Sequence, residues 1–130
     1  MKATILPAFW KNLMAVTYVI NFQVREGRRE EFLELLEGVL NGMRCEPELH
    51  RAILHRDPAS EDRFMLYETW ESHEDVLSVQ IHRPYRRSWH EALPRLLAQE
   101  RDISIWEPMR SDRRHSAPQR MGRAAEMDRE

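Results

Sequence analysis

A carboxylate and an indole share one face of a strand-like run at residues 63–71. Glu68 alternates with Phe64 and Leu66, and Trp70 follows on the same side. A carboxylate among apolar neighbours either has a raised pKa suited to proton transfer or is paired with an arginine, and we favour the pair. The Trp70 ring could stack on a planar ligand, but an aromatic at a strand end more often belongs to the core.

Four further positions carry side chains suited to a ligand pocket. Asn21 lies in the middle of an alternating segment, where its amide either donates to a ligand or is satisfied within a sheet. Tyr85 and Trp89 share the inner stripe of an expected helix, where core residues also line any pocket beneath it. His90 follows and could act as a base, although a solvated histidine is the more ordinary role.

The sequence lacks most standard catalytic and metal-binding motifs. It has no glycine-rich phosphate loop, no G-x-S-x-G elbow, no C-x-x-C and no H-E-x-x-H. The six histidines are scattered along the chain. We therefore expect no metal site.

Composition excludes several classes of protein. The 130 residues suffice for one domain. Residues 1–108 carry a formal net charge of −4 and residues 109–130 carry +2, whereas a nucleic-acid binder concentrates cations on its folded surface. The single cysteine, Cys45, excludes an internal disulfide and favours a reducing cytoplasm. Because about 18 apolar residues never run together and no cleavage site follows the N-terminus, we expect neither export nor membrane binding.

The strands and helices that position these candidate residues are predicted from the hydrophobic periodicity of the sequence. Residues 15–24 alternate strictly and predict a strand with two unlike faces. From Arg28 the apolar residues recur at three and four positions, which predicts an amphipathic helix ending near Cys45 because Pro47 follows closely. Two more alternating runs, 50–56 and 63–71, flank a loop rich in turn formers and predict a hairpin.

The second half of the chain is predicted to contain two more helices and a last strand. Ser72 is a good N-cap for a short helix over residues 73–79. Pro84 fits the first turn of another helix, which Pro94 should kink or end. Residues 101–107 predict the last strand.

The resulting order, β-α-β-β-α-β, predicts an α+β fold of the ferredoxin-like kind, an antiparallel sheet with helices on one face. The strands are apolar on both faces, so the uncovered face needs a partner, and a homodimer joined sheet to sheet is the economical solution. We expect this domain at residues 15–108. Residues 1–14 form an apolar extension expected to pack on the domain or the dimer partner, and residues 109–130 form a polar tail expected to be disordered.

The segment 67–72 (Tyr-Glu-Thr-Trp-Glu-Ser), the segment 80–86 (Gln-Ile-His-Arg-Pro-Tyr-Arg) and the preceding unit at residues 18–32 resemble the antibiotic biosynthesis monooxygenase (ABM) family. The resemblance runs over about residues 15–108. It implies a small dimeric α+β barrel with an apolar pocket between sheet and helices, in which Asn21 and Trp70 match the family's strand-one asparagine and its tryptophan. Many members have histidines at the positions of Gln80 and Tyr85, so an acid–base role of those histidines does not transfer.

The resemblance implies a function as well. Characterised relatives oxidise quinols, anthrones or similar aromatic compounds with molecular oxygen and without metal or flavin. A deprotonated phenolic substrate can itself reduce oxygen, so the protein need only bind it, orient it, exclude water and move a proton. We therefore expect a cofactor-independent monooxygenase with Asn21, Trp70 and His90 as catalytic residues and Glu68, Tyr85 and Trp89 as substrate-binding residues.

Two other functions remain open on the sequence. Haem degradation by a monooxygenase of the same superfamily would make haem the cofactor, with Asn21 and His90 as counterparts of the haem-holding residues. The position of its haem-side tryptophan falls near Val79 or Gln80, which weakens this hypothesis. The third possibility is a non-catalytic dimeric module for small-ligand binding or stress response, because a fold alone does not fix a function.

Overall fold

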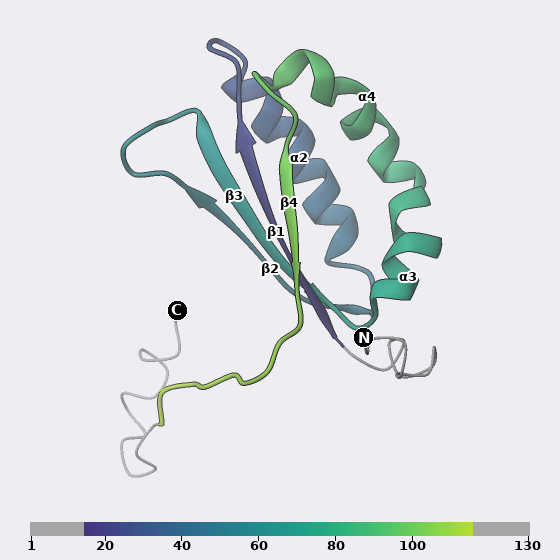
Figure 1. Ribbon diagram of the computed structural model, residues 1–130. Helices are drawn as coiled ribbons and strands as arrows, with labels where there is room; N and C mark the ends of the chain where they lie inside the picture. The colour runs from purple at the N-terminus through teal and green to yellow at the C-terminus, as the bar shows by residue number, and fades with distance from the viewer. Residues whose placement is uncertain (1–14, 116–130) are drawn as a thin grey trace, which may run out of the picture.

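A computed structural model of the chain describes residues 15–115. Four antiparallel strands form one sheet in the order β2-β3-β1-β4, and the helices all lie on one side of it (Figure 1). The strands and helices are β1 (Val16–Gln23), α2 (Arg29–Met43), β2 (Leu49–Arg56), β3 (Arg63–Trp70), α3 (His73–Ser78), α4 (Arg87–Leu96) and β4 (Asp102–Trp106). Two short 3-10 turns, η2 (Gln80–His82) and η3 (Pro84–Arg86), join α3 to α4. The predicted α+β ferredoxin-like fold is thus confirmed.

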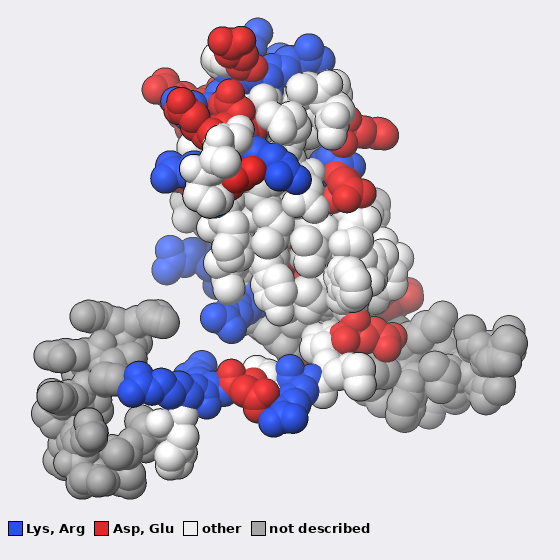
Figure 2. Space-filling view, turned by 60° about the vertical axis from the view of Figure 1, so that its left-hand side comes forward, with Lys and Arg blue, Asp and Glu red and all other residues white. Residues whose placement is uncertain are grey.

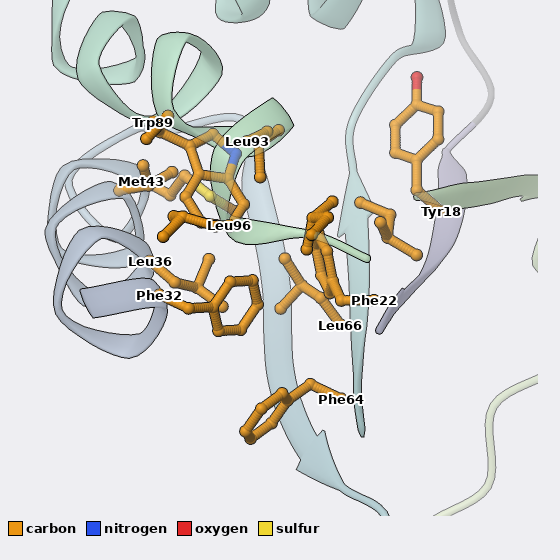
Figure 3. Close-up of a cluster of buried hydrophobic side chains, with 14 of the residues drawn as sticks. Tyr18, Phe22, Phe32, Leu36, Met43, Phe64, Leu66, Trp89, Leu93 and Leu96 are labelled. Carbon is orange, nitrogen blue, oxygen red and sulfur yellow. The ribbon is translucent and has the colours of Figure 1, made fainter. Parts of the chain in front are cut away.

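The core lies between the sheet and the helices. Alternation along β1 sends every second side chain to this side, and the same period holds in β3. Phe22 meets Phe32 of α2 edge to face at 5.1 Å and Trp89 of α4 at 5.7 Å, and Phe64 stacks on Phe32 at 5.2 Å. Figure 3 shows these rings converging between the two layers. Aromatic packing therefore fixes both long helices against the sheet.

The helix ends agree with the local sequence signals. The Ser72 side chain accepts a hydrogen bond of 3.1 Å from the Asp75 backbone N–H, which caps α3 as expected. Pro84 opens η3, and α4 itself begins at Arg87. Pro94 lies in the last turn of α4, which ends at Leu96.

The side of the sheet without helices is largely uncharged. Figure 2 views this side, where uncharged side chains occupy the centre and charged ones gather toward the ends. The partly exposed residues here are Val19, Asn21, Gln23, Ile53, Met65, Tyr67 and Thr69. We call this surface the open face.

The expectations for residues 1–14 and 116–130 lie outside the described residues. Residues 109–115 are exposed and form neither helix nor strand. Among the residues that the structure describes, no helix has the length and the apolar composition needed to cross a membrane.

Candidate functional site

Glu68 is the buried carboxylate of the sheet. It lies on the helix side of β3 with 5% of its surface exposed, directly opposite Tyr18 of β1. Its Oε1 accepts a hydrogen bond of 2.5 Å from the Trp70 indole N–H. Burial raises the pKa of Glu68, against the opposing effects of that hydrogen bond and of the charges of Arg86 and Arg101.

The arginine pair that we expected for Glu68 is not formed. No Arg, Lys or His within residues 15–115 lies at ion-pair distance from this carboxylate. The indole is its partner instead, because residues two apart on a strand point to the same face.

Tyr18 forms a partly buried polar contact with α3. Its hydroxyl lies 2.6 Å from His73 Nδ1 at the start of α3. Burial, with the charge of Glu68 as a second cause, raises the pKa of Tyr18 to about 12. The phenol is therefore protonated throughout the physiological range and is able to donate to Nδ1.

Arg86 is a buried cation at the start of α4. Only 9% of its surface is exposed, and its guanidinium carbon lies 5.8 Å from the Trp70 ring centre and 5.7 Å from the Tyr85 ring centre. Aromatic faces favour a desolvated guanidinium at such distances. The Arg86 Nε has no hydrogen-bond acceptor within the described part of the chain.

A cavity of about 470 Å³ lies between the end of α4 and the start of β4. Its walls are formed by Arg25, His90, Leu93, Pro94, Leu97, Ala98, Gln99, Glu100 and Arg101. We call it the α4–β4 cavity. It combines an apolar wall from α4 with the His90 imidazole, the guanidiniums of Arg25 and Arg101, and the carboxylate of Glu100.

His90 is the titratable base of the α4–β4 cavity. It lies four residues after Arg86, the N-cap residue of α4, and is partly exposed. Burial lowers the pKa of His90, and the positive charges of Arg101 and Arg86 lower it further. The ring is therefore neutral at pH 7 and can accept a proton.

The helix side of the sheet is open along its β4 edge. Ile103 and Ile105 project to the helix side, opposite Ile20 and Tyr18, yet 45% and 57% of their surfaces are exposed. The helices therefore do not extend over β4. A ligand or a second chain can reach the helix side of the sheet along this edge.

Two expected pocket residues are core residues. Trp70 is fully buried, and 3% of Trp89 is exposed, where it packs on Phe22 and Phe32. The core role that we considered for Trp70 is the one observed. Its contact with Glu68 still connects it to the buried polar groups.

Tyr85 points away from the α4–β4 cavity. Its hydroxyl donates to Glu46 Oε2 at 3.0 Å, and its ring lies over Gly42 of α2, where a Cβ atom would come within 2.7 Å of the ring. Tyr85 and Trp89 instead line a separate, more open depression of about 740 Å³ between α2 and α4.

Asn21 is not brought together with the other candidates. It pairs with Met65 of β3 and Asp102 of β4 on the open face, whereas Glu68 lies on the helix side. The period of two along β1 causes this separation, because the buried Ile20 and Phe22 flank Asn21. Neither the expected pocket nor the Asn21 and His90 pair of the haem hypothesis is assembled within one chain.

Sequence reasoning missed four residues that the fold gathers here: Tyr18, His73, Arg86 and Arg101. Signals for three of them were present. Tyr18 alternates with buried residues of β1, Arg86 precedes His90 by four positions, and Arg101 precedes Ile103 by two on the inward side of the last strand. The contact of His73 with Tyr18 joins residues 55 positions apart, and no local pattern indicates it.

Metal-ligating side chains do not converge in the described region. Within residues 15–115, no group of three His, Cys, Asp or Glu side chains lies close enough together to hold a metal ion.

Residues 15–92 match the family model described as antibiotic biosynthesis monooxygenase. The chain is also 26% identical over 87 residues to an uncharacterized protein of Synechocystis sp.. That match covers 67% of this chain and 58% of the relative, so the chain spans less than two thirds of the relative's length.

Several solved structures share the fold. A putative antibiotic biosynthesis monooxygenase from Nitrosomonas europaea is 20% identical with a TM-score of 0.68, covering 75% of this chain and 92% of that one. Rv0793 from Mycobacterium tuberculosis is 18% identical with a TM-score of 0.68, covering 75% and 97%. SnoaB, a cofactor-independent oxygenase from Streptomyces nogalater, is 20% identical with a TM-score of 0.62, covering 81% and 98%. These similarities concern the fold.

Proposed function

The chain belongs to the antibiotic biosynthesis monooxygenase family, and from that premise we propose that it oxidises a quinol-like or polycyclic aromatic compound with molecular oxygen in the α4–β4 cavity. The reaction needs no metal or organic cofactor in this proposal. Support for that part comes from the similarity in fold to SnoaB, a cofactor-independent oxygenase.

The observation that carries the proposal is a neutral imidazole beside two cations at a partly apolar cavity. His90 lines the cavity together with Arg101, and Arg86 lies four residues earlier, at the end of η3 and the N-cap position of α4. A neutral imidazole can accept the proton of a phenol, and the guanidinium charges stabilise the phenolate that forms. The same two charges that lower the His90 pKa would thus favour the anion that His90 creates.

Loss of this proton makes the ring of the substrate electron-rich enough to reduce oxygen. For an anthrone-like substrate, a CH2 group and O2 give a C=O group and H2O. The substrate supplies all the electrons, one oxygen atom enters the product and the other leaves as water. The protein's tasks are to bind the ring, to take a proton and to exclude solvent.

The residues of the site have distinct proposed roles. His90 is the catalytic base, and Arg101 stabilises the anion. Trp70 and Glu68 are positioning residues, since the indole holds the carboxyl and supports the Arg86 guanidinium. Trp89 fixes α4 on the core.

We further propose that two copies associate through their open faces. The uncharged centre of that face in Figure 2 and the partly exposed Met65 and Tyr67 support this arrangement. Asn21 would then lie at the dimer interface rather than in the cavity of its own chain.

Oxygen consumption tests the proposed activity. Purified full-length protein treated with EDTA is assayed with 1,4-naphthohydroquinone and with anthrone, and the spontaneous oxidation rate is subtracted. We expect protein-dependent uptake, and His90→Gln should lower kcat/KM by about 100-fold, the ordinary contribution of a general base.

His82→Gln is the matched control, because His82 is exposed and lies outside the cavity. It should leave the rate unchanged. Equal rates for His90→Gln and the wild type would remove His90 from the mechanism, and no uptake with any quinol would contradict the oxygenase proposal.

A further inference from the structure

Two arginines of this domain lack the partner that their burial calls for. Several arginines within residues 15–115 form an ion pair or a side-chain hydrogen bond. Of those that form neither, all but two are exposed at the surface. Arg86 and Arg101 are the exceptions, one buried and the other partly buried. A buried guanidinium is normally satisfied by a carboxylate or a carbonyl oxygen.

The nearby groups of the chain do not neutralise these two charges. Glu68 interacts with both arginines through its charge, but it lies beyond ion-pair distance from them, and its raised pKa favours the uncharged carboxyl. The Tyr85 hydroxyl lies near Arg86 but is uncharged, and it donates a hydrogen bond to Glu46. The charge of Glu100 raises the pKa of Arg101, yet Glu100 is exposed and forms no ion pair with Arg101.

Arg101 lines the α4–β4 cavity, and Arg86 lies four residues before His90, at the N-cap position of α4. Both lower the pKa of His90, which lines the α4–β4 cavity beside Arg101. The same cavity wall carries Leu93 and Leu97, which present an apolar surface next to the charges. The cavity therefore offers an apolar wall beside Arg101 and Arg25, with Glu100 as the acidic residue of the lining.

We propose that the ligand of the α4–β4 cavity is an aromatic carboxylate. Its ring lies on Leu93 and Leu97, and Arg101 receives the carboxylate. Arg86 is buried four residues before His90 and adds a second positive charge from outside the cavity lining. A carboxylate matches the planar fork of a guanidinium. This inference rests on the proposed function for the location of the site and adds the charge of the substrate.

The test compares an acid with its amide. Isothermal titration calorimetry under anaerobic conditions measures binding of 1-hydroxy-2-naphthoate and of 1-hydroxy-2-naphthamide to the full-length chain. The two probes share size and ring system and differ in one charge. We expect the acid to bind at least about tenfold more tightly, with an advantage that falls as salt rises.

Arginine variants localise the effect. Arg101→Gln should weaken binding of the acid by about tenfold or more and leave the amide unchanged, because only the charged contact is removed. Arg86→Gln should act in the same direction, and Arg86→Lys should restore part of the loss if the variant keeps its thermal unfolding temperature. Arg87→Gln is the matched control, since Arg87 is exposed and directly follows Arg86 in the chain.

The outcomes separate this inference from the proposed activity. Equal affinities for acid and amide, no binding of either probe, or equal effects of Arg101→Gln and Arg87→Gln would overturn it. Arginine-dependent binding of the acid without oxygen uptake would uphold the ligand class and contradict the oxygenase proposal. Turnover of neutral hydroquinones with no preference for the acid would do the reverse.

Discussion

The indole of Trp70 donates a hydrogen bond of 2.5 Å to the carboxyl of Glu68, two residues earlier on the same face of β3. Both side chains are buried, at 0% and 5% exposure. An acceptor inside an apolar layer is satisfied in this way by an uncharged donor, so the carboxyl gains no full counter-charge. The consequence is a carboxyl that favours its protonated form, because burial raises its pKa.

Replacing Glu68 by Gln should stabilise the protein at neutral pH. The ordinary Glu pKa of 4.5 applies to the unfolded chain, and the folded value is higher. Below the unfolded-state pKa, Glu68 is protonated in both the folded and the unfolded state, so its ionisation does not change the free energy of unfolding. As pH rises above this pKa, the unfolded state releases a proton that the native state retains, so the wild type loses stability.

Urea denaturation between about pH 4 and pH 8 measures this difference. The Gln side chain keeps an acceptor oxygen for Trp70, so the gap between variant and wild type should open as pH rises. The exposed Glu107→Gln serves as control and should show no such gap. A gap that closes with rising pH would mean that the carboxylate is charged and stabilised in the folded state.

Gly42 should tolerate no side chain. A Cβ atom at this position would lie 2.7 Å from the Tyr85 ring, so Gly42→Ala should cost about 1–3 kcal/mol of unfolding free energy through overpacking. Gly38→Ala in the same helix meets nothing within 4 Å and should gain roughly 0.5–1 kcal/mol from helix propensity. Urea denaturation of both variants measures these changes in unfolding free energy. If both variants lose the same unfolding free energy, the contact with Tyr85 is not responsible.

His90 should titrate below its ordinary value of 6.5. The ring resonances in two-dimensional NMR spectra, assigned with His90→Gln, give the midpoint directly. Arg101→Gln should move that midpoint upward, because one of the positive charges that oppose protonation is removed. Arg87→Gln should leave it in place, and a midpoint at or above 6.5 in the wild type would contradict the electrostatics of the cavity.

The open face should mediate dimer formation. Sedimentation equilibrium should show a dimer for the wild type, and Tyr67→Glu should weaken it by about 100-fold or more, because an unpaired carboxylate would be buried in the interface. Leu77→Glu introduces the same charge at an exposed apolar residue of α3 and should leave the dimer intact. Equal association of Tyr67→Glu and wild type would place the interface elsewhere.

Much of the fold was predictable because its signals are local. The strict alternation of β1, the change of period at α2 and the Ser72 cap each depend on residues a few positions apart. Their order then determines the sheet, since the sequence β-α-β-β-α-β leaves few topologies. The end of α4 was also foreseen, from Pro94.

The candidate site was less predictable because it depends on which partner a side chain meets. Glu68 was expected to find an arginine, but its neighbour along the same strand face is Trp70. Asn21 was assigned to the pocket from its residue type and from its match to the family's strand-one asparagine. The alternation of β1 already placed it on the other face of the strand from the buried Ile20 and Phe22. The approach of Arg101 to α4 depends on the path of the chain between two elements, and no periodicity describes that path.

The alternation of β1 gives this family member a particular constraint on its evolution. Tyr18 and Ile20 serve the helix side, and Val19 and Asn21 serve the open face, so neighbouring codons specify two different surfaces. A point substitution can therefore change the helix side or the open face without changing the other. Loss or gain of a single codon within this strand would exchange the two surfaces at once. Lineages of this chain should therefore accumulate length changes in the loop at residues 57–62 while β1 keeps its length.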